Sequence, residues 1–418
     1  MFVSAGTGMG QLLVLVASPL ISRLYSPRDF GIFAVFAAIA SVLVSISALR
    51  YEMAIPLPKL DSDGVVLLMV SCATVLVVSC VSTLVVCCCY FANLLPSYLS
   101  LIRGYLWLLP ISVLVPGFQA VLLSWAVRKQ NYTLIARTRI WQGASLMLCQ
   151  VAFGLAHAGA VGLIAGFIVG QTAGVGSLAS VLWREEKRSF GSESISKLRT
   201  VAGHYWRFPV FNAPSTLLNT LTGAVPPIVL ASVFNASTAG AFSFSQRVFA
   251  APSTLVGKSL SQVYFAEIAK DKHNDPTRIL NRFRQSTRAL GLFGLGLGII
   301  ALASPIWFQP IFGHQWNTAA TYSQIFAPVF AASLAFSPTI NFNLFDRNSW
   351  QLGWDAFQAV LLAITCVWVI LRTPQPQTAI MMLALIAFIG YVLVFYLNRK
   401  VHVLGVKQAS STIPADSL

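Results

Sequence analysis

Apolar stretches of about 20 residues follow one another along almost the whole chain and are separated by short polar loops. A helix needs about 20 apolar residues to cross roughly 30 Å of hydrocarbon. These runs are too long and too continuously apolar to be strands of a membrane barrel, which alternate apolar and polar positions. The pattern predicts an all-α polytopic membrane protein with about 12 transmembrane helices, near residues 3–22, 30–49, 65–90, 101–127, 140–157, 160–183, 208–233, 239–266, 287–310, 318–345, 351–371 and 377–397.

The composition agrees with this pattern. Of the 418 residues, 56% are hydrophobic and 10% are charged, and the mean hydropathy is +0.73. One soluble core cannot bury that much apolar surface, so a bilayer has to supply the solvent.

The positive charge is distributed unevenly over the loops. The formal net charge is +15, but 22 of the 28 Lys and Arg lie in every second loop and in the C-terminal tail, and two lie inside a predicted span. The other loops hold only Arg23, Arg28, Arg103 and Arg372. By the positive-inside rule both termini face the cytoplasm, and the charge does not indicate a nucleic-acid partner.

Other kinds of chemistry find little support in the sequence. The seven cysteines all fall in apolar segments without CxxC spacing, which is typical of packing residues. Asp271, His273 and Asp275 alternate with lysines and are interpreted as a solvated loop, so no metal site is expected. No nucleotide-binding or hydrolase motif occurs, so we expect no cofactor and no enzyme activity.

The chain carries a weak internal repeat. Residues 29–34, Asp-Phe-Gly-Ile-Phe-Ala, open the second span, and residues 238–243, Thr-Ala-Gly-Ala-Phe-Ser, open the eighth; Gly31 and Gly240 differ by 209 positions. Six helices per half give both halves the same orientation, so the repeats would be related by a pseudo-twofold axis along the membrane normal. We expect an N-terminal lobe over residues 1–205 and a C-terminal lobe with a short tail over residues 206–418.

Several segments resemble the bacterial oligosaccharide (O-antigen type) flippases, the polysaccharide transporter branch of the multidrug/oligosaccharidyl-lipid/polysaccharide exporter superfamily. The resemblance covers essentially the full length and is carried by residues 18–33, 49–58, 131–132, 135–136, 246–248, 251–253 and 262–264. It implies a twelve-helix, two-lobe protein of the bacterial inner membrane. It also implies a substrate, an undecaprenyl-diphosphate-linked sugar repeat unit moved from the cytoplasmic to the periplasmic leaflet.

Two cations inside the eighth span are candidates for binding the diphosphate. Arg247 and Lys258 are 11 residues apart, which places them within about 20° of one another on a helix. A cation at the bilayer centre costs roughly 2.5–3.5 kcal/mol, so two in one helix need an explanation. The alternatives are that Arg247 snorkels to the periplasmic surface or pairs with a carboxylate such as Asp355.

Further candidates lie in the seventh expected span and just after the second. Asn212, Thr216 and Asn219 share one helix face and could bind sugar hydroxyls or join helices. Arg50, beside the second span, could receive diphosphate or serve as a positive-inside anchor. Glu52 is expected to pair with a neighbouring cation, although two residues apart it should point away from Arg50.

Arg23 and Arg28 flank the loop before the second span. Pro27 and Asp29 predict a turn and helix cap there, so a structural corner is the first interpretation and a release-side phosphate contact the second.

The sequence favours a flippase that works by alternating access in surface polysaccharide synthesis, such as that of lipopolysaccharide O-antigen. A multidrug cation antiporter is the first alternative, although the embedded charges are positive and buried carboxylates are few. A polysaccharide polymerase or ligase is the second, although every loop on the expected periplasmic side is short. Anionic membrane lipids are expected partners of the basic loops, and a polymerase and chain-length regulator are candidate protein partners.

Overall fold

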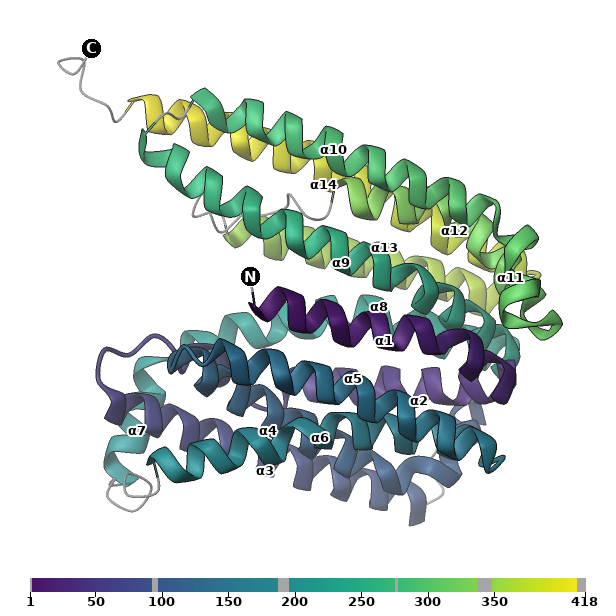
Figure 1. Ribbon diagram of the computed structural model, residues 1–418, viewed down its shortest axis with the longest axis horizontal. Coiled ribbons are helices and arrows are strands. Elements are labelled where there is room, and N and C mark those ends of the chain that lie inside the picture. The colour runs from purple at the N-terminus through teal and green to yellow at the C-terminus, as the bar shows by residue number, and fades with distance from the viewer. Residues whose placement is uncertain (1, 92–96, 187–194, 275–276, 337–347, 412–418) are drawn as a thin grey trace. The chain divides into compact units, whose positions relative to one another are not determined.

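The computed structural model describes residues 2–91, 97–186, 195–274, 277–336 and 348–411, and each of these ranges is mainly helical (Figure 1). No strand occurs in these ranges. The longer helices are α1 (Phe2–Leu24), α2 (Pro27–Ile46), α3 (Asp61–Phe91), α4 (Leu109–Arg128), α5 (Tyr132–Leu155), α6 (Ala160–Glu186), α8 (Ala213–Val233), α9 (Ala236–Asn274), α10 (Thr277–Leu302), α12 (Asn317–Phe336), α13 (Asn348–Arg372) and α14 (Pro376–Ser411). Shorter elements are η1 (Tyr51–Ala54), η2 (Ser97–Leu108), α7 (Ile195–His204), η3 (Phe208–Asn212), α11 (Ser304–Phe312) and η4 (His314–Trp316).

The helices have the length and surface of membrane spans. Within the described ranges, nine are long and apolar enough to cross a bilayer. The other three expected spans coincide with α1, α5 and α9. Large apolar side chains such as Val16, Leu371 and Ile306 are 75–78% exposed, as expected for side chains that face lipid rather than water.

The structure refines several of the expected boundaries. The ninth expected span divides into α10 and α11, because Ala303 ends one helix and Pro305 begins the next within its first two positions. The amphipathic helix α7 was not predicted, and α14 continues well beyond residue 397. The end of the tenth expected span, residues 337–345, lies outside the described residues.

By its internal contacts the chain divides into two units, Met1–Ser243 and Phe244–Leu418. The division falls inside α9, so the first unit includes α8 and the start of α9. In the second unit, α12 contacts α10, α11 and α14. The expected boundary between an N-terminal lobe over residues 1–205 and a C-terminal lobe over residues 206–418 stays a prediction.

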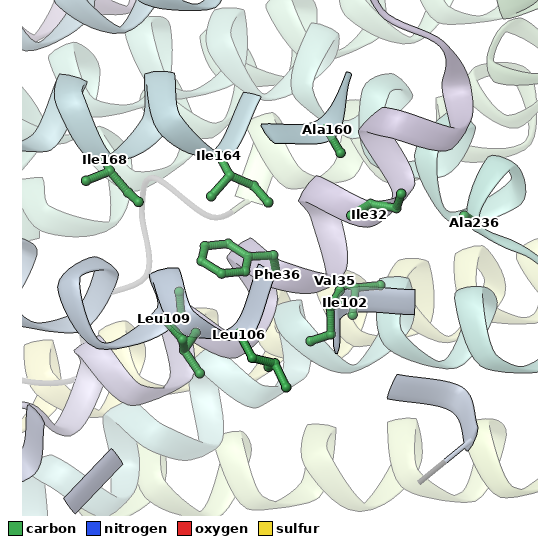
Figure 2. Close-up of a cluster of buried hydrophobic side chains, with 11 residues drawn as sticks. Ile32, Val35, Phe36, Ile102, Leu106, Leu109, Ala160, Ile164, Ile168 and Ala236 are labelled. Carbon is green, nitrogen blue, oxygen red and sulfur yellow. The ribbon is translucent and has the colours of Figure 1, made fainter. Parts of the chain in front are cut away.

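Within the first unit, helix α2 contacts α4, α6 and α8. Its side chains Ile32, Val35 and Phe36 are almost fully buried. They pack against η2, the start of α4, α6 and Ala236 of α9 (Figure 2). This cluster fixes the positions of α2 and of the start of α9 within the unit.

The two glycines of the repeat lie where α2 and α9 cross: Gly31 of α2 contacts α9, and Gly240 of α9 contacts α2. A Cβ atom at Gly31 would overlap the carbonyl oxygen of Ala236, and one at Gly240 would overlap that of Pro27. Ala236 and Pro27 differ by 209 positions, as Gly31 and Gly240 do. The contact is therefore symmetric under the repeat, and only glycine allows the two backbones to approach this closely. We call these four residues the glycine crossing.

Candidate functional site

The site begins at the C-terminal end of α2, where the backbone departs from regular helix. Leu49 and Arg50 have φ angles of 49° and 62°, in the left-handed region. Each such residue costs roughly 1–2 kcal/mol when it is not glycine. The short helix η1 follows immediately, with Arg50 at its N-cap. Strain of this kind persists only where the surroundings enforce it, and it is frequent at functional sites.

This backbone turn brings Arg50 and Glu52 together. Arg50 Nη1 lies 3.3 Å from Glu52 Oε1, with the two side chains 28% and 9% exposed. Burial raises the pKa of the Glu52 carboxyl, and Arg50 opposes that shift. The expectation that Glu52 pairs with a cation is confirmed. The expectation that the two point to different sides is wrong, because it assumed regular geometry through residues 49–52.

The pair does not satisfy all of its own polar atoms. Arg50 Nε and Glu52 Oε2 are both buried and make no hydrogen bond to the described residues. A buried donor or acceptor without a partner costs about 1–3 kcal/mol, so such atoms are uncommon in native proteins. A cation with a spare donor is suited to an anionic ligand.

Elements distant in sequence surround this pair. The Tyr51 hydroxyl donates a 3.3 Å hydrogen bond to the carbonyl oxygen of Ala202 in α7, and η1 contacts η3 at the start of α8. Tyr205 and Phe208 pack against the same hydrophobic cluster as Tyr51. The structure therefore brings Arg50 and Glu52 near the beginning of the helix that carries Asn212 and Asn219.

A stripe of small and polar residues runs along one face of α8. Asn212, Asn219 and Gly223 are exposed, and Thr216 is half-buried. Farther along the same face, Leu230 is fully buried. Because Thr216 and Thr222 donate to carbonyl oxygens of their own helix, the two asparagine amides are the more available hydrogen-bonding groups. We call Asn212, Thr216, Asn219 and Gly223 the α8 stripe.

The candidates in the second unit are placed less completely. Arg247 is half-buried in α9 and does interact with neighbouring groups. Lys258 lies in the same helix beyond Pro252, and its side chain is outside the described residues. Asp355, considered as a partner for Arg247, is buried and also engaged. A shared diphosphate site at Arg247 and Lys258 stays a prediction.

At the other end of α2 the arrangement is structural. Ser26 caps the helix, and its backbone N–H and hydroxyl donate to Asp29 Oδ2 over 3.0 and 2.6 Å, while Asp29 N donates to Ser26 Oγ. This capping box follows Arg23 and agrees with the predicted corner, with Ser26 as the cap residue. Arg23 and Arg28 are exposed.

Sequence reasoning missed one important cation, Arg128 at the end of α4. Its guanidinium donates to the carbonyl oxygens of Ile55, Pro58 and Leu60 over 2.9–3.0 Å, and to Asp61 Oδ1. The side chain is only 7% exposed. Arg128 therefore holds the loop that follows η1 in place. Its position at a helix end was visible in the sequence, but backbone carbonyl partners leave no sequence signal.

The described residues contain no group of three or more His, Cys, Asp or Glu that could hold a metal ion. The arrangement is instead a set of cations and amides on membrane helices. Such a set can bind an anionic, hydroxyl-rich molecule without bond-making chemistry.

Comparison with solved structures identifies the fold. A lipid II flippase, MurJ, in an inward closed conformation superposes with a TM-score of 0.71 at 11% sequence identity, covering 98% of this chain and 90% of that one. An inward-facing multidrug resistance transporter of the MATE family and MOP superfamily gives 0.63 at 12%, covering 99% and 96%. The protein thus has the two-lobe, twelve-helix fold of MOP-superfamily flippases and transporters.

The family follows from the sequence itself. The family described as "Polysaccharide biosynthesis protein" matches residues 20–321, and the chain belongs to it. Comparison with curated protein sequences gives no match.

Proposed function

We propose that the protein is a flippase that moves an undecaprenyl-diphosphate-linked oligosaccharide repeat unit from the cytoplasmic to the periplasmic leaflet by alternating access. The family supports a role in polysaccharide synthesis, and the fold supports a transporter. The protein would sit in a bacterial inner membrane with both termini in the cytoplasm, where the basic loops place them. O-antigen synthesis is the pathway we expect it to serve.

One observation carries the proposal: the α8 stripe, exposed at Asn212, Asn219 and Gly223, begins near the Arg50–Glu52 pair and ends before Leu230, which is fully buried on the same face. An exposed polar surface that starts beside a cation is suited to a head group that joins a diphosphate to sugars. In this scheme Arg50 receives the diphosphate from the inner leaflet, with Glu52 orienting its guanidinium. Asn212 and Asn219 hydrogen-bond sugar hydroxyls.

The remaining candidates act later in the cycle. Arg247 and Lys258 would hold the diphosphate in the second unit, and Arg23 would meet it on the periplasmic side. Energy would come from an ion gradient, the membrane potential or consumption of the product.

The test is a deletion strain complemented with variants. Loss of the gene should accumulate the completed lipid-linked repeat unit in the inner leaflet and remove the surface glycan. Asn212→Ala with Asn219→Ala should restore little glycan at normal expression, whereas Asn281→Ala with Gln285→Ala, two exposed amides of α10, should restore it fully. Accumulation in the outer leaflet would point instead to a polymerase or ligase, and an unchanged glycan would point to the multidrug antiporter.

A further inference from the structure

A groove of about 920 Å³ lies in the first unit between residues 58–63 and one face of α7. This volume is in the range of about 300–1,000 Å³ found for small-molecule sites. The groove is lined by Pro58, Lys59, Leu60, Asp63, Lys197, Thr200, Val201, His204 and Tyr205. The residues from α7 recur every three to four positions, so they form a single face of that helix.

The lining combines an apolar surface with cations. Leu60, Val201 and Tyr205 provide the apolar part, and Lys59 and Lys197 bring two positive charges. Thr200 and His204 add groups that can donate hydrogen bonds. The one carboxylate, Asp63, lies 3.8 Å from Lys197 Nζ and offsets part of its charge. A net positive charge beside apolar side chains is complementary to a phosphate attached to hydrocarbon.

The surroundings indicate where this groove lies relative to a bilayer. Leu57, Leu60 and Trp206 are 48–64% exposed around it. Apolar and tryptophan side chains exposed beside lysines are typical of the membrane–water interface. α7 is itself a short amphipathic helix joining two spans, and it packs against the start of α3 (Figure 1). The groove therefore opens at the depth of the lipid head groups.

We propose that this groove is a binding site for the head group of an anionic phospholipid, with Lys59 and Lys197 at its phosphate and Leu60, Val201 and Tyr205 against its glycerol and upper acyl chain. The site is distinct from the Arg50–Glu52 pair and does not depend on the proposed function. Because Tyr51 of η1 is bonded to α7, a lipid that orders α7 would also order the entrance of the candidate transport site.

The test is native mass spectrometry of the purified full-length protein released from nanodiscs of phosphatidylglycerol mixed with phosphatidylcholine. Wild type should retain phosphatidylglycerol in preference to phosphatidylcholine. Lys59→Gln with Lys197→Gln should weaken that retention by about tenfold, the value of one charge-assisted hydrogen bond.

The matched control is Arg137→Gln with Arg199→Gln, which removes two exposed cations from the same unit, one of them from α7 but outside the groove. It should retain the lipid as wild type does. Equal losses in the two double variants would overturn the proposal in favour of diffuse attraction to the bilayer. Displacement of the lipid by millimolar inorganic diphosphate would also overturn it, because the groove would then be a site for free phosphates. If the double variant does not fold, Lys59→Glu alone, in the exposed loop, should give the same loss.

Discussion

The two ends of α2 are held by opposite kinds of interaction. At its N-terminal end, a capping box and the glycine crossing bring regular backbones into direct contact. At its C-terminal end, two residues have left-handed backbone angles, and a buried ion pair leaves two polar atoms without partners. The first arrangement is tightly packed, and Ser26 and Asp29 hydrogen-bond to one another. The second carries strain and unsatisfied groups, which a bound ligand or a rearrangement can relieve.

The largest effect is expected from substitutions that add a bulky side chain at either glycine of the glycine crossing. Gly31→Val and Gly240→Val should each abolish transport and destabilise the fold by about 3 kcal/mol or more, because the atoms in the way are backbone carbonyls that cannot rotate aside. Because the contact is symmetric under the repeat, the two variants should behave alike. Thermal unfolding and glycan restoration in the deletion strain measure both effects.

The matched controls are Gly176→Ala in α6 and Gly296→Ala in α10, where nothing lies within 4 Å of an added Cβ. Both should be as stable as wild type or slightly more stable, by about 0.5–1 kcal/mol. If even Gly31→Ala and Gly240→Ala matched these controls in stability and transport, the close contact at this end would be wrong.

A second prediction concerns the strained end of α2. Arg50→Met should cost up to about 3 kcal/mol, at the lower limit for a broken buried pair because Arg50 is partly exposed. Glu52→Gln should cost less, and the double variant should recover part of the loss caused by Arg50→Met. A double-mutant cycle of thermal stabilities measures the coupling. Strictly additive losses would show that the two charges do not stabilise one another.

The same comparison shows what could be predicted from the sequence. The equivalence of Gly31 and Gly240 follows from a repeat of six residues with an offset of 209 positions, but their close contact with Ala236 and Pro27 was found only in the structure. The helices follow from uninterrupted apolar runs, since a bilayer leaves the backbone few alternatives. The Arg50–Glu52 contact could not be predicted, because it depends on left-handed angles at Leu49 and Arg50, residue types that seldom adopt them. The groove beside α7 was also missed, since its two sides are more than 130 positions apart in the sequence.

A third prediction concerns the loop after η1. Arg128→Lys should destabilise the protein by about 2 kcal/mol, because an ammonium group cannot reach three carbonyl oxygens and Asp61 at once. Arg137→Lys, at an exposed position of α5, should change stability by less than about 0.5 kcal/mol. Equal effects of the two substitutions on thermal unfolding would show that Arg128 does not hold this loop.

The smallest effect is expected from Asp61, which Arg128 and Lys129 contact at 2.9 and 3.1 Å. Hydrogen bonds from Arg128 and then Lys129 lower the pKa of the Asp61 carboxyl below its usual 3.8. The contribution of this group is therefore complete above the ordinary pKa and is lost as the pH falls below about 4. Asp61 is 67% exposed, so the contribution belongs with surface ion pairs, about 0–1 kcal/mol. Thermal midpoints between pH 6 and pH 3 should fall less steeply in Asp61→Asn than in wild type. Parallel slopes would mean that Arg128 stabilises the loop through the backbone carbonyl oxygens alone. The region at the C-terminal end of α2 would then depend on charge only at the Arg50–Glu52 pair.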